Sequence, residues 1–134
     1  MARVLIAYDG SDVSRRALER VITFMKTAEI GLVTVARPIY RDPRYTGYTD
    51  PNTEEEQRKL LFEARDTLEA EGITSTGYAP VGDPAEQILA AAKEFGTDLI
   101  VMGARSLGTV ERFVLGSVST KVMHEVECDV LIVK

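Results

Sequence analysis

The sequence contains a single cysteine, Cys128, and a single histidine, His124. One cysteine cannot form an intramolecular disulfide, and it cannot build the cysteine clusters that bind zinc or iron. The only histidine falls in the last expected helix, so the pattern places no Cys–His or Ser–His pair. The residues therefore give no support for a hydrolase built on a nucleophile and a histidine base, and we expect no catalytic residue of that kind.

Long apolar runs and an excess of positive charge are also lacking. No run approaches the roughly 18 residues of a membrane-spanning helix, and Asp9 interrupts the first apolar residues too early for a secretion signal. The formal net charge is −5, which argues against nucleic acid or an anionic membrane as a partner. We expect a cytoplasmic protein with a reduced cysteine, folded as a single domain over residues 1–134.

Five short apolar segments are typical of buried strands in a parallel sheet. The third segment alternates polar and apolar residues, which favours an edge position for it. The expected strands cover residues 3–8, 30–36, 73–81, 99–102 and 128–134.

Helical patterns separate these strands, and each begins at a capping signal. Ser11 or Asp12 caps the first helix, Asn52-Thr53 precede the second, and Asp83 followed by Pro84 starts the third. The expected helices run from about residue 12 to 25, 54 to 71, 84 to 95 and 116 to 125. Strands that alternate with helices predict an α/β fold, namely an open five-stranded parallel sheet with helices on both faces.

The stretch from Thr97 to Thr120 is the most informative part of the chain. An apolar strand ends at Gly103, Gly108 follows in a loop, and Gly116-Ser117 opens a helix. A strand, a glycine-containing loop and a helix N-terminus form a common phosphate site, because backbone N–H groups and the helix macrodipole both attract an anion. Ligands of such sheets lie beyond the carboxyl ends of the strands.

Five segments of the chain resemble the universal stress proteins of the single-domain UspA-like type. They are VLIAYDGS, VGDPAEQIL, DLIVMGARSLG, FVLGSVSTKVM and CDVLIVK. The nucleotide-binding branch of that family has a pattern of Gly, two residues, Gly, nine residues, Gly and Ser/Thr. Gly103, Ser106, Gly116 and Ser117 stand at those positions, so this chain carries serine where the pattern has its second glycine.

The resemblance implies a strand order of 3-2-1-4-5 and an adenine nucleotide alpha hydrolase-like fold. It also implies ATP with Mg²⁺ as the ligand, and a homodimer in which the last strands, from Cys128 to Lys134, pair. Asp9 would lie near the ribose or the metal–phosphate end, with Ala7 and Tyr8 at the base and Val35 offering backbone groups to adenine. The remaining implied site residues are Met102 and Gly103 beside the ribose, and Ser106, Gly116, Ser117, Val118 and Ser119 around the phosphates.

Each of these residues also has a structural interpretation. Asp9 is equally explained as a turn residue, and Ser117 as the cap of the last helix. Arg105 and Arg112 either meet phosphate or stay solvated. His124 is assigned a structural or surface role. Cys128 is interpreted as a buried core thiol, with redox sensing as the alternative. Residues 37–51 form either a functional loop or an unimportant excursion.

Three functions remain at this point. The first is a dimeric, nucleotide-dependent regulatory protein whose protein partner is unknown. The second is a dimeric interaction protein of the same fold that has lost the nucleotide site through Ser106. The third is an ATP hydrolase, which ranks lowest because no G-x-x-x-x-G-K-[ST] segment occurs and no lysine stands in the loop.

Overall fold

The computed structural model describes residues 1–36, 54–104 and 116–134. Strands and helices alternate along these parts of the chain, and the five strands form one sheet in the order β3-β2-β1-β4-β5 with all pairs parallel. The expected fold class and strand order are therefore confirmed. The elements are β1 (Arg3–Ala7), α1 (Asp12–Phe24), β2 (Glu29–Val33), α2 (Glu54–Ala70), β3 (Ser75–Tyr78), α3 (Pro84–Phe95), β4 (Leu99–Gly103), α4 (Ser117–Glu125) and β5 (Asp129–Val133).

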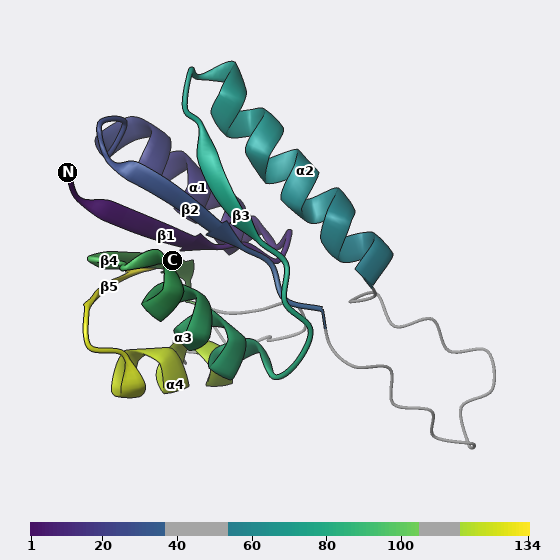
Figure 1. Cartoon of the computed structure of the whole chain (residues 1–134), viewed down its shortest axis with the longest axis vertical. Helices are drawn as coiled ribbons and strands as arrows, with labels where there is room; N and C mark the ends of the chain where they lie inside the picture. The colour runs from purple at the N-terminus through teal and green to yellow at the C-terminus, as the bar shows by residue number, and fades with distance from the viewer. Residues whose placement is uncertain (37–53, 105–115) are drawn as a thin grey trace.

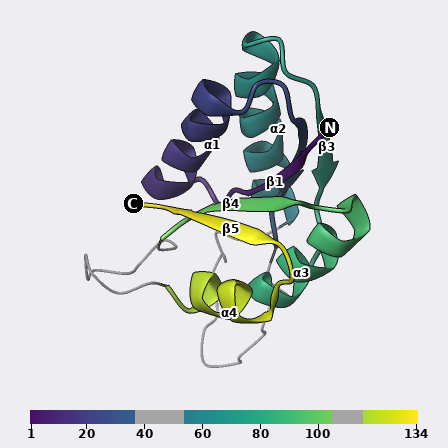
Figure 2. The ribbon, with the colours of Figure 1, turned by 90° about the vertical axis from the view of Figure 1, so that its left-hand side faces the viewer.

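The sheet lies between two helical layers, with α1 and α2 on one face and α3 and α4 on the other (Figures 1 and 2). Successive strand residues point to opposite faces, so each central strand contributes to both cores. In β1, Val4 and Ile6 pack under α1 and α2, whereas Leu5 and Ala7 pack under α3 and α4. This alternation decides which predicted site residues face the same layer.

Local signals set the helix ends. Ser11, not Asp12, caps α1, since its side chain accepts a hydrogen bond from the Ser14 N–H at 3.3 Å. Asp83 caps α3 as expected, with Pro84 at its start, and α3 ends at Gly96 in the left-handed conformation with φ 70°. The proposed cap at residues 52 and 53 lies outside the described residues.

Two expectations about the edges of the sheet change in detail. The third strand is indeed an edge strand, but it covers only Ser75–Tyr78 and not residues 73–81. The last strand starts at Asp129, so Cys128 precedes it. At the start of β3, the Ile73 N–H donates to the Leu68 carbonyl of α2 instead of to the sheet, and beyond the end of β3 Pro80 has no N–H for the ladder with β2. An apolar pattern alone does not mark either point.

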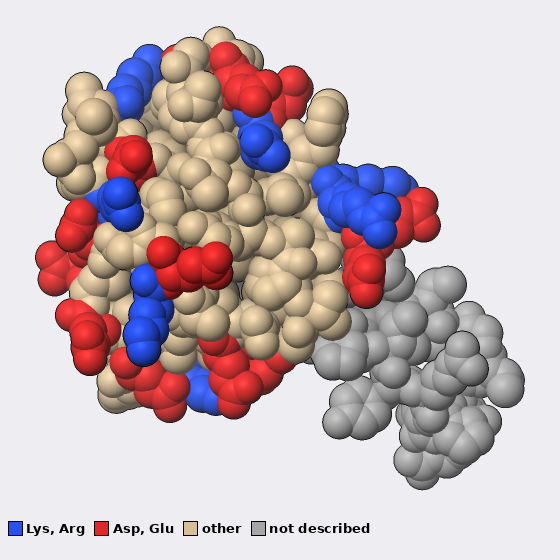
Figure 3. All heavy atoms as spheres, viewed as in Figure 1, with Lys and Arg blue, Asp and Glu red and all other residues tan. Residues whose placement is uncertain are grey.

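Charged groups of both signs are interspersed on the face seen in Figure 3. Ion pairs between exposed side chains include Arg3 with Glu29 at 2.8 Å and Lys26 with Glu71 at 3.6 Å. Within the described residues, no helix is both long and apolar enough to cross a membrane.

Candidate functional site

The carboxyl ends of β1, β2 and β4 meet at one edge of the sheet, beside the N-terminus of α4. Helix α1 packs closely against the end of β4. A Cβ added to Gly103 would lie 2.5 Å from Cγ2 of Val13 and 3.0 Å from the Val13 carbonyl carbon. Glycine is therefore required at position 103 for the approach of α1, on the face opposite to α4.

Hydrogen bonds from the backbone of Gly116 and the side chain of Ser119 hold α4 at the end of β4. The Gly116 N–H donates to the Ala104 carbonyl at 2.7 Å, and the Ser119 hydroxyl donates to the Gly103 carbonyl at 2.9 Å. Ser119 is only 2% exposed, so its hydroxyl anchors the helix. The structure thus gives Ser119 a side-chain role that the sequence did not indicate.

The first turn of α4 points its backbone donors at this edge. Gly116 is the N-cap residue, and no side chain caps the helix, so the interpretation of Ser117 as the cap is wrong. Ser117 is instead the first helical residue, and it is exposed. The N–H groups of Ser117, Val118 and Ser119 have no intrahelical partner, because the first turn of any helix leaves them unpaired. This arrangement suits an anion.

Four of the predicted residues gather on the α3/α4 side of the sheet. Ala7 and Met102 belong to the core under these helices, and Val35 and Val118 pack against it. The side chain of Tyr8 lies on the opposite face, in the core under α1 and α2. The alternation of β1 makes this unavoidable, since neighbouring residues of a strand cannot line the same face.

The Tyr8 hydroxyl interacts with Arg15 and Glu63, which join α1 to α2 with a nitrogen–oxygen distance of 3.4 Å. Burial raises the pKa of Tyr8 above its usual value, and the hydrogen bond from Arg15 opposes that rise. The phenol therefore stays protonated at neutral pH and serves as a polar contact between the two helices.

Val35 lies at the same end of the sheet, and its backbone groups have no backbone partner among the described residues. The Thr34 N–H donates to the Tyr78 carbonyl at 3.1 Å, and the Ala36 N–H donates to the Pro80 carbonyl at 3.0 Å. Both of these bonds point toward β3. Successive residues of a strand alternate in direction, so the N–H and C=O of Val35 point toward β1. Since β1 has ended there, Val35 makes no backbone hydrogen bond to any other described residue.

Asp9 lies in the turn that follows β1, where its Oδ1 accepts a hydrogen bond from the Ser11 N–H at 2.9 Å. The structure thus shows the turn role of Asp9, and the half-buried side chain lies at the same edge as Gly103. No group of three or more His, Cys, Asp or Glu side chains in the described parts of the chain is placed to hold a metal ion. Mg²⁺ does not require such a group, because it is often held by one carboxylate, substrate phosphates and water.

Several predicted features lie outside the described residues. These are Ser106, Gly108, Arg105 and Arg112 in the segment after β4, and residues 37–51 after β2.

The order of strands and the anchored N-terminus of α4 can be compared with known proteins. A family model described as the universal stress protein family matches residues 1–134. The chain belongs to the universal stress protein family. It is 38% identical over 139 residues to a universal stress protein of Thermus aquaticus from the QAH/OAS sulfhydrylase 3′ region, and the match covers 98% of this chain and 97% of the relative.

Solved structures of the family share the architecture. The chain superposes on the hypothetical protein MJ0577 with a TM-score of 0.80 at 27% identity, over 98% of this chain and 94% of the other. The adenine nucleotide alpha hydrolase-like fold is thus confirmed. A universal stress protein crystallised in complex with cAMP gives a TM-score of 0.74 at 29% identity, over 99% and 97% of the two chains.

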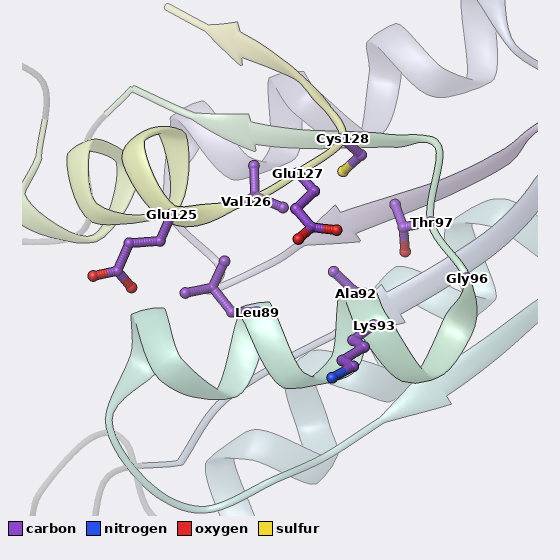
Figure 4. Close-up of a pocket in the computed structure, with 9 residues that line it drawn as sticks. All are labelled: Leu89, Ala92, Lys93, Gly96, Thr97, Glu125, Val126, Glu127 and Cys128. Atoms are coloured by element: carbon purple, nitrogen blue, oxygen red, sulfur yellow. The ribbon is translucent and has the colours of Figure 1, made fainter.

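This member of the universal stress protein family also has a pocket at the opposite edge of the sheet, between α3 and the α4–β5 connection (Figure 4). The pocket has a volume of about 510 Å³, and its lining includes Cys128 and Thr97. From the sequence, Cys128 is interpreted as a buried core thiol; the structure shows it half-buried and packed against the core under α3 and α4. Burial raises the pKa of its thiol, with smaller contributions from Asp129 and Asp98. The thiol is therefore a weak nucleophile at neutral pH.

Sequence reasoning missed two polar residues near the strand ends. Gln57 of α2 is 4% exposed and donates hydrogen bonds to the carbonyls of Thr34 and Pro80. Lys121 of α4 pairs with Asp83 at 3.8 Å and with Glu86 at 3.6 Å, which ties α4 to the N-terminus of α3. A signal existed for Gln57, because it occupies a position of the apolar stripe of α2 that continues at Leu61, Ala64 and Leu68.

Proposed function

We propose that this universal stress protein binds an adenine nucleotide, with Mg-ATP as the working ligand, at the carboxyl ends of β1, β2 and β4. The observation that carries the proposal is the placement, at one end of the sheet, of two kinds of backbone group that have no partner within the part of the chain that the structure describes. The first turn of α4 supplies N–H donors for phosphate. Val35 supplies an N–H and a C=O for the edge of a base. A relative that is 29% identical and binds cAMP supports this assignment.

The residues at the edge suit such a ligand chemically. Ala7, Val35 and Met102 provide apolar contacts on the side of the sheet that carries α4. In our proposal, Ser117, Val118 and Ser119 hold the phosphates through backbone N–H groups, and Gly116, whose own N–H donates to the Ala104 carbonyl, lines the phosphates without a side chain. Gly103 flanks the ribose through its backbone, Tyr8 contributes only backbone atoms, and Asp9 approaches the ribose or Mg²⁺.

The wider function that we propose is regulatory. Nucleotide binding would change a surface that a protein partner recognises, and any ATP hydrolysis would be slow. The proposal includes a cytoplasmic location. It also includes a single domain, which is supported by the nine described elements packing in one layered unit. It also includes a homodimer formed through β5, which is an edge strand with Leu131 37% exposed. An unpaired apolar edge is a hazard for aggregation unless another strand covers it.

A calorimetric titration with ATP, with and without Mg²⁺, tests nucleotide binding. We expect binding in the micromolar range for the wild type and at least about tenfold weaker binding for Ser117→Glu, because the added carboxylate repels phosphate. The substitution should not destabilise the folded state, since an acidic residue in the first turn interacts favourably with the helix macrodipole. Ala90→Glu, on the exposed side of α3, is the matched control and should bind like the wild type.

Two results would contradict the proposal. No heat from folded, nucleotide-free wild type would favour the alternative of an interaction protein without a nucleotide site. If Ser117→Glu and Ala90→Glu bind ATP with equal affinity, the phosphates do not bind at the N-terminus of α4. The variant Ser106→Gly separates a lost site from an accommodated serine, because a large gain in affinity indicates the former and little change the latter.

A further inference from the structure

A gap in the β2–β3 hydrogen-bond ladder explains the placement of Gln57. Beyond the paired strands, the ladder continues through Thr34 N–H to Tyr78 O, Ala36 N–H to Pro80 O, and Gly82 N–H to Ala36 O, at 2.9 to 3.1 Å. The Thr34 carbonyl should then accept from the backbone nitrogen of residue 80, as a regular parallel ladder requires. Residue 80 is proline, which has no N–H to donate.

The side chain of Gln57 supplies the missing donor. Its Nε2 donates to the Thr34 carbonyl at 2.8 Å and also to the Pro80 carbonyl at 2.6 Å. The Thr34 hydroxyl donates in turn to the Gln57 carbonyl at 3.5 Å. Thr34 is 1% exposed and Gln57 is 4% exposed, so solvent has little access to replace these bonds. One carboxamide therefore joins the ends of β2 and β3 to the first turn of α2.

This junction fixes the residue that we assign to base recognition. Val35 lies between Thr34 and Ala36, and both neighbours are held on their β3 side by the contacts of Gln57 and Pro80. With its neighbours held, the peptide groups of Val35 keep their N–H and C=O directed toward β1. We infer that Gln57 is a positioning residue for adenine recognition, acting through the Thr34 carbonyl in place of the donor that Pro80 lacks. The inference rests on the proposed function.

The ratio of ATP affinity to GTP affinity is a suitable readout, because general destabilisation of the protein does not change it. Adenine offers an amino donor beside a ring-nitrogen acceptor, which complements a C=O and an N–H. Guanine presents a carbonyl acceptor and an N–H donor in the reversed order. A correctly held Val35 should therefore prefer ATP to GTP, and a loosened Val35 should lose that preference.

The experiment measures ATP affinity by calorimetry and GTP affinity by displacement of ATP, for four variants and the wild type. Gln57→Met keeps a similar volume and removes the donor. We expect its ATP-over-GTP preference to fall about tenfold, equivalent to about 1.4 kcal/mol. Pro80→Ala restores a backbone N–H at residue 80, so Gln57→Met/Pro80→Ala should recover most of the lost preference. Pro80→Ala alone, and the control Thr67→Val on the exposed side of α2, should resemble the wild type.

The outcomes separate the two proposals. If the wild type binds ATP, and Gln57→Met keeps the wild-type preference or is not rescued by Pro80→Ala, Gln57 has no positioning role and the nucleotide site stands. If the wild type binds no nucleotide, the proposed function fails and this inference fails with it. Should Gln57→Met not fold, the double variant carries the test, because it contains a donor for Thr34. Its ATP-over-GTP preference must then match that of Pro80→Ala, and a lower value overturns the inference.

Discussion

The substitution Gly103→Ala tests why glycine stands at the end of β4. The new Cβ would lie 2.5 Å from Cγ2 and 2.8 Å from Cβ of Val13, and 3.0 Å from the Val13 carbonyl carbon. One of these atoms is backbone, so α1 must move away from β4. Overpacking of this kind costs about 1–3 kcal/mol. Alanine also restricts the unfolded chain, which returns about 0.4–1 kcal/mol.

We therefore expect Gly103→Ala to lower the free energy of unfolding by about 1–2 kcal/mol. Urea denaturation followed by circular dichroism measures this change. Gly77→Ala is the matched control, because its new Cβ would meet only the flexible side chain of Leu61, at 3.2 Å. That variant should be as stable as the wild type or slightly more stable.

A double-mutant cycle with Val13→Ala identifies the contact. Val13→Ala alone removes two buried methyl groups and should cost about 1.5 kcal/mol. In the double variant the closest contact, to Cγ2, no longer exists, so the combined loss should be smaller than the sum by about 0.5 kcal/mol or more. Strictly additive losses, or a Gly103→Ala variant as stable as Gly77→Ala, would refute the packing explanation.

Two further predictions concern β5 and the cysteine that precedes it. The folded state raises the pKa of Cys128 above the ordinary thiol value of 9.0, so it holds this proton more tightly than the unfolded chain does. The contribution of Cys128 to stability should therefore be constant below about pH 9 and be lost as the pH rises further. Urea midpoints between pH 7 and 10.5 should show a smaller fall for Cys128→Ala, and an identical pH dependence would contradict this. For the proposed dimer through β5, we expect a wild-type dimer in light scattering and a monomer for Leu131→Lys, since lysine on an edge strand opposes pairing. A monomeric wild type would exclude the proposed dimer.

The fold followed from the sequence because its signals are local and repeated. Apolar runs ended at turn residues, and caps such as Asp83 followed by Pro84 marked the helix starts. The strand order 3-2-1-4-5 came from the family resemblance. Boundaries were less accurate, as β3 shows, because the ends of a strand depend on which backbone groups find a partner in the sheet: Ile73 bonds to α2, and Pro80 has no N–H.

The phosphate end of the candidate site was also visible in the sequence, but the reason for one of its glycines was not. The spacing of Gly103 and Gly116 indicated an anion site, and the structure places the N-terminus of α4 beside β4. However, the position that a Cβ of residue 103 would take is occupied by Val13 of α1 and not by the first turn of α4. A motif records that glycine is needed, and only the packing shows which neighbour requires it.

The base end of the site could be predicted only in part. Val35 was assigned to it through the family resemblance, but its dependence on Gln57 involves residues that are 22 positions apart and joined by a side chain. Two observations had to be combined, namely a proline in the extension of an edge strand and a glutamine in an apolar helical stripe. Each is unremarkable alone, since proline is tolerated at sheet edges and a buried glutamine needs only some partner. Together they predict a substituted hydrogen bond, because a buried carbonyl left without a donor would cost about 1–3 kcal/mol.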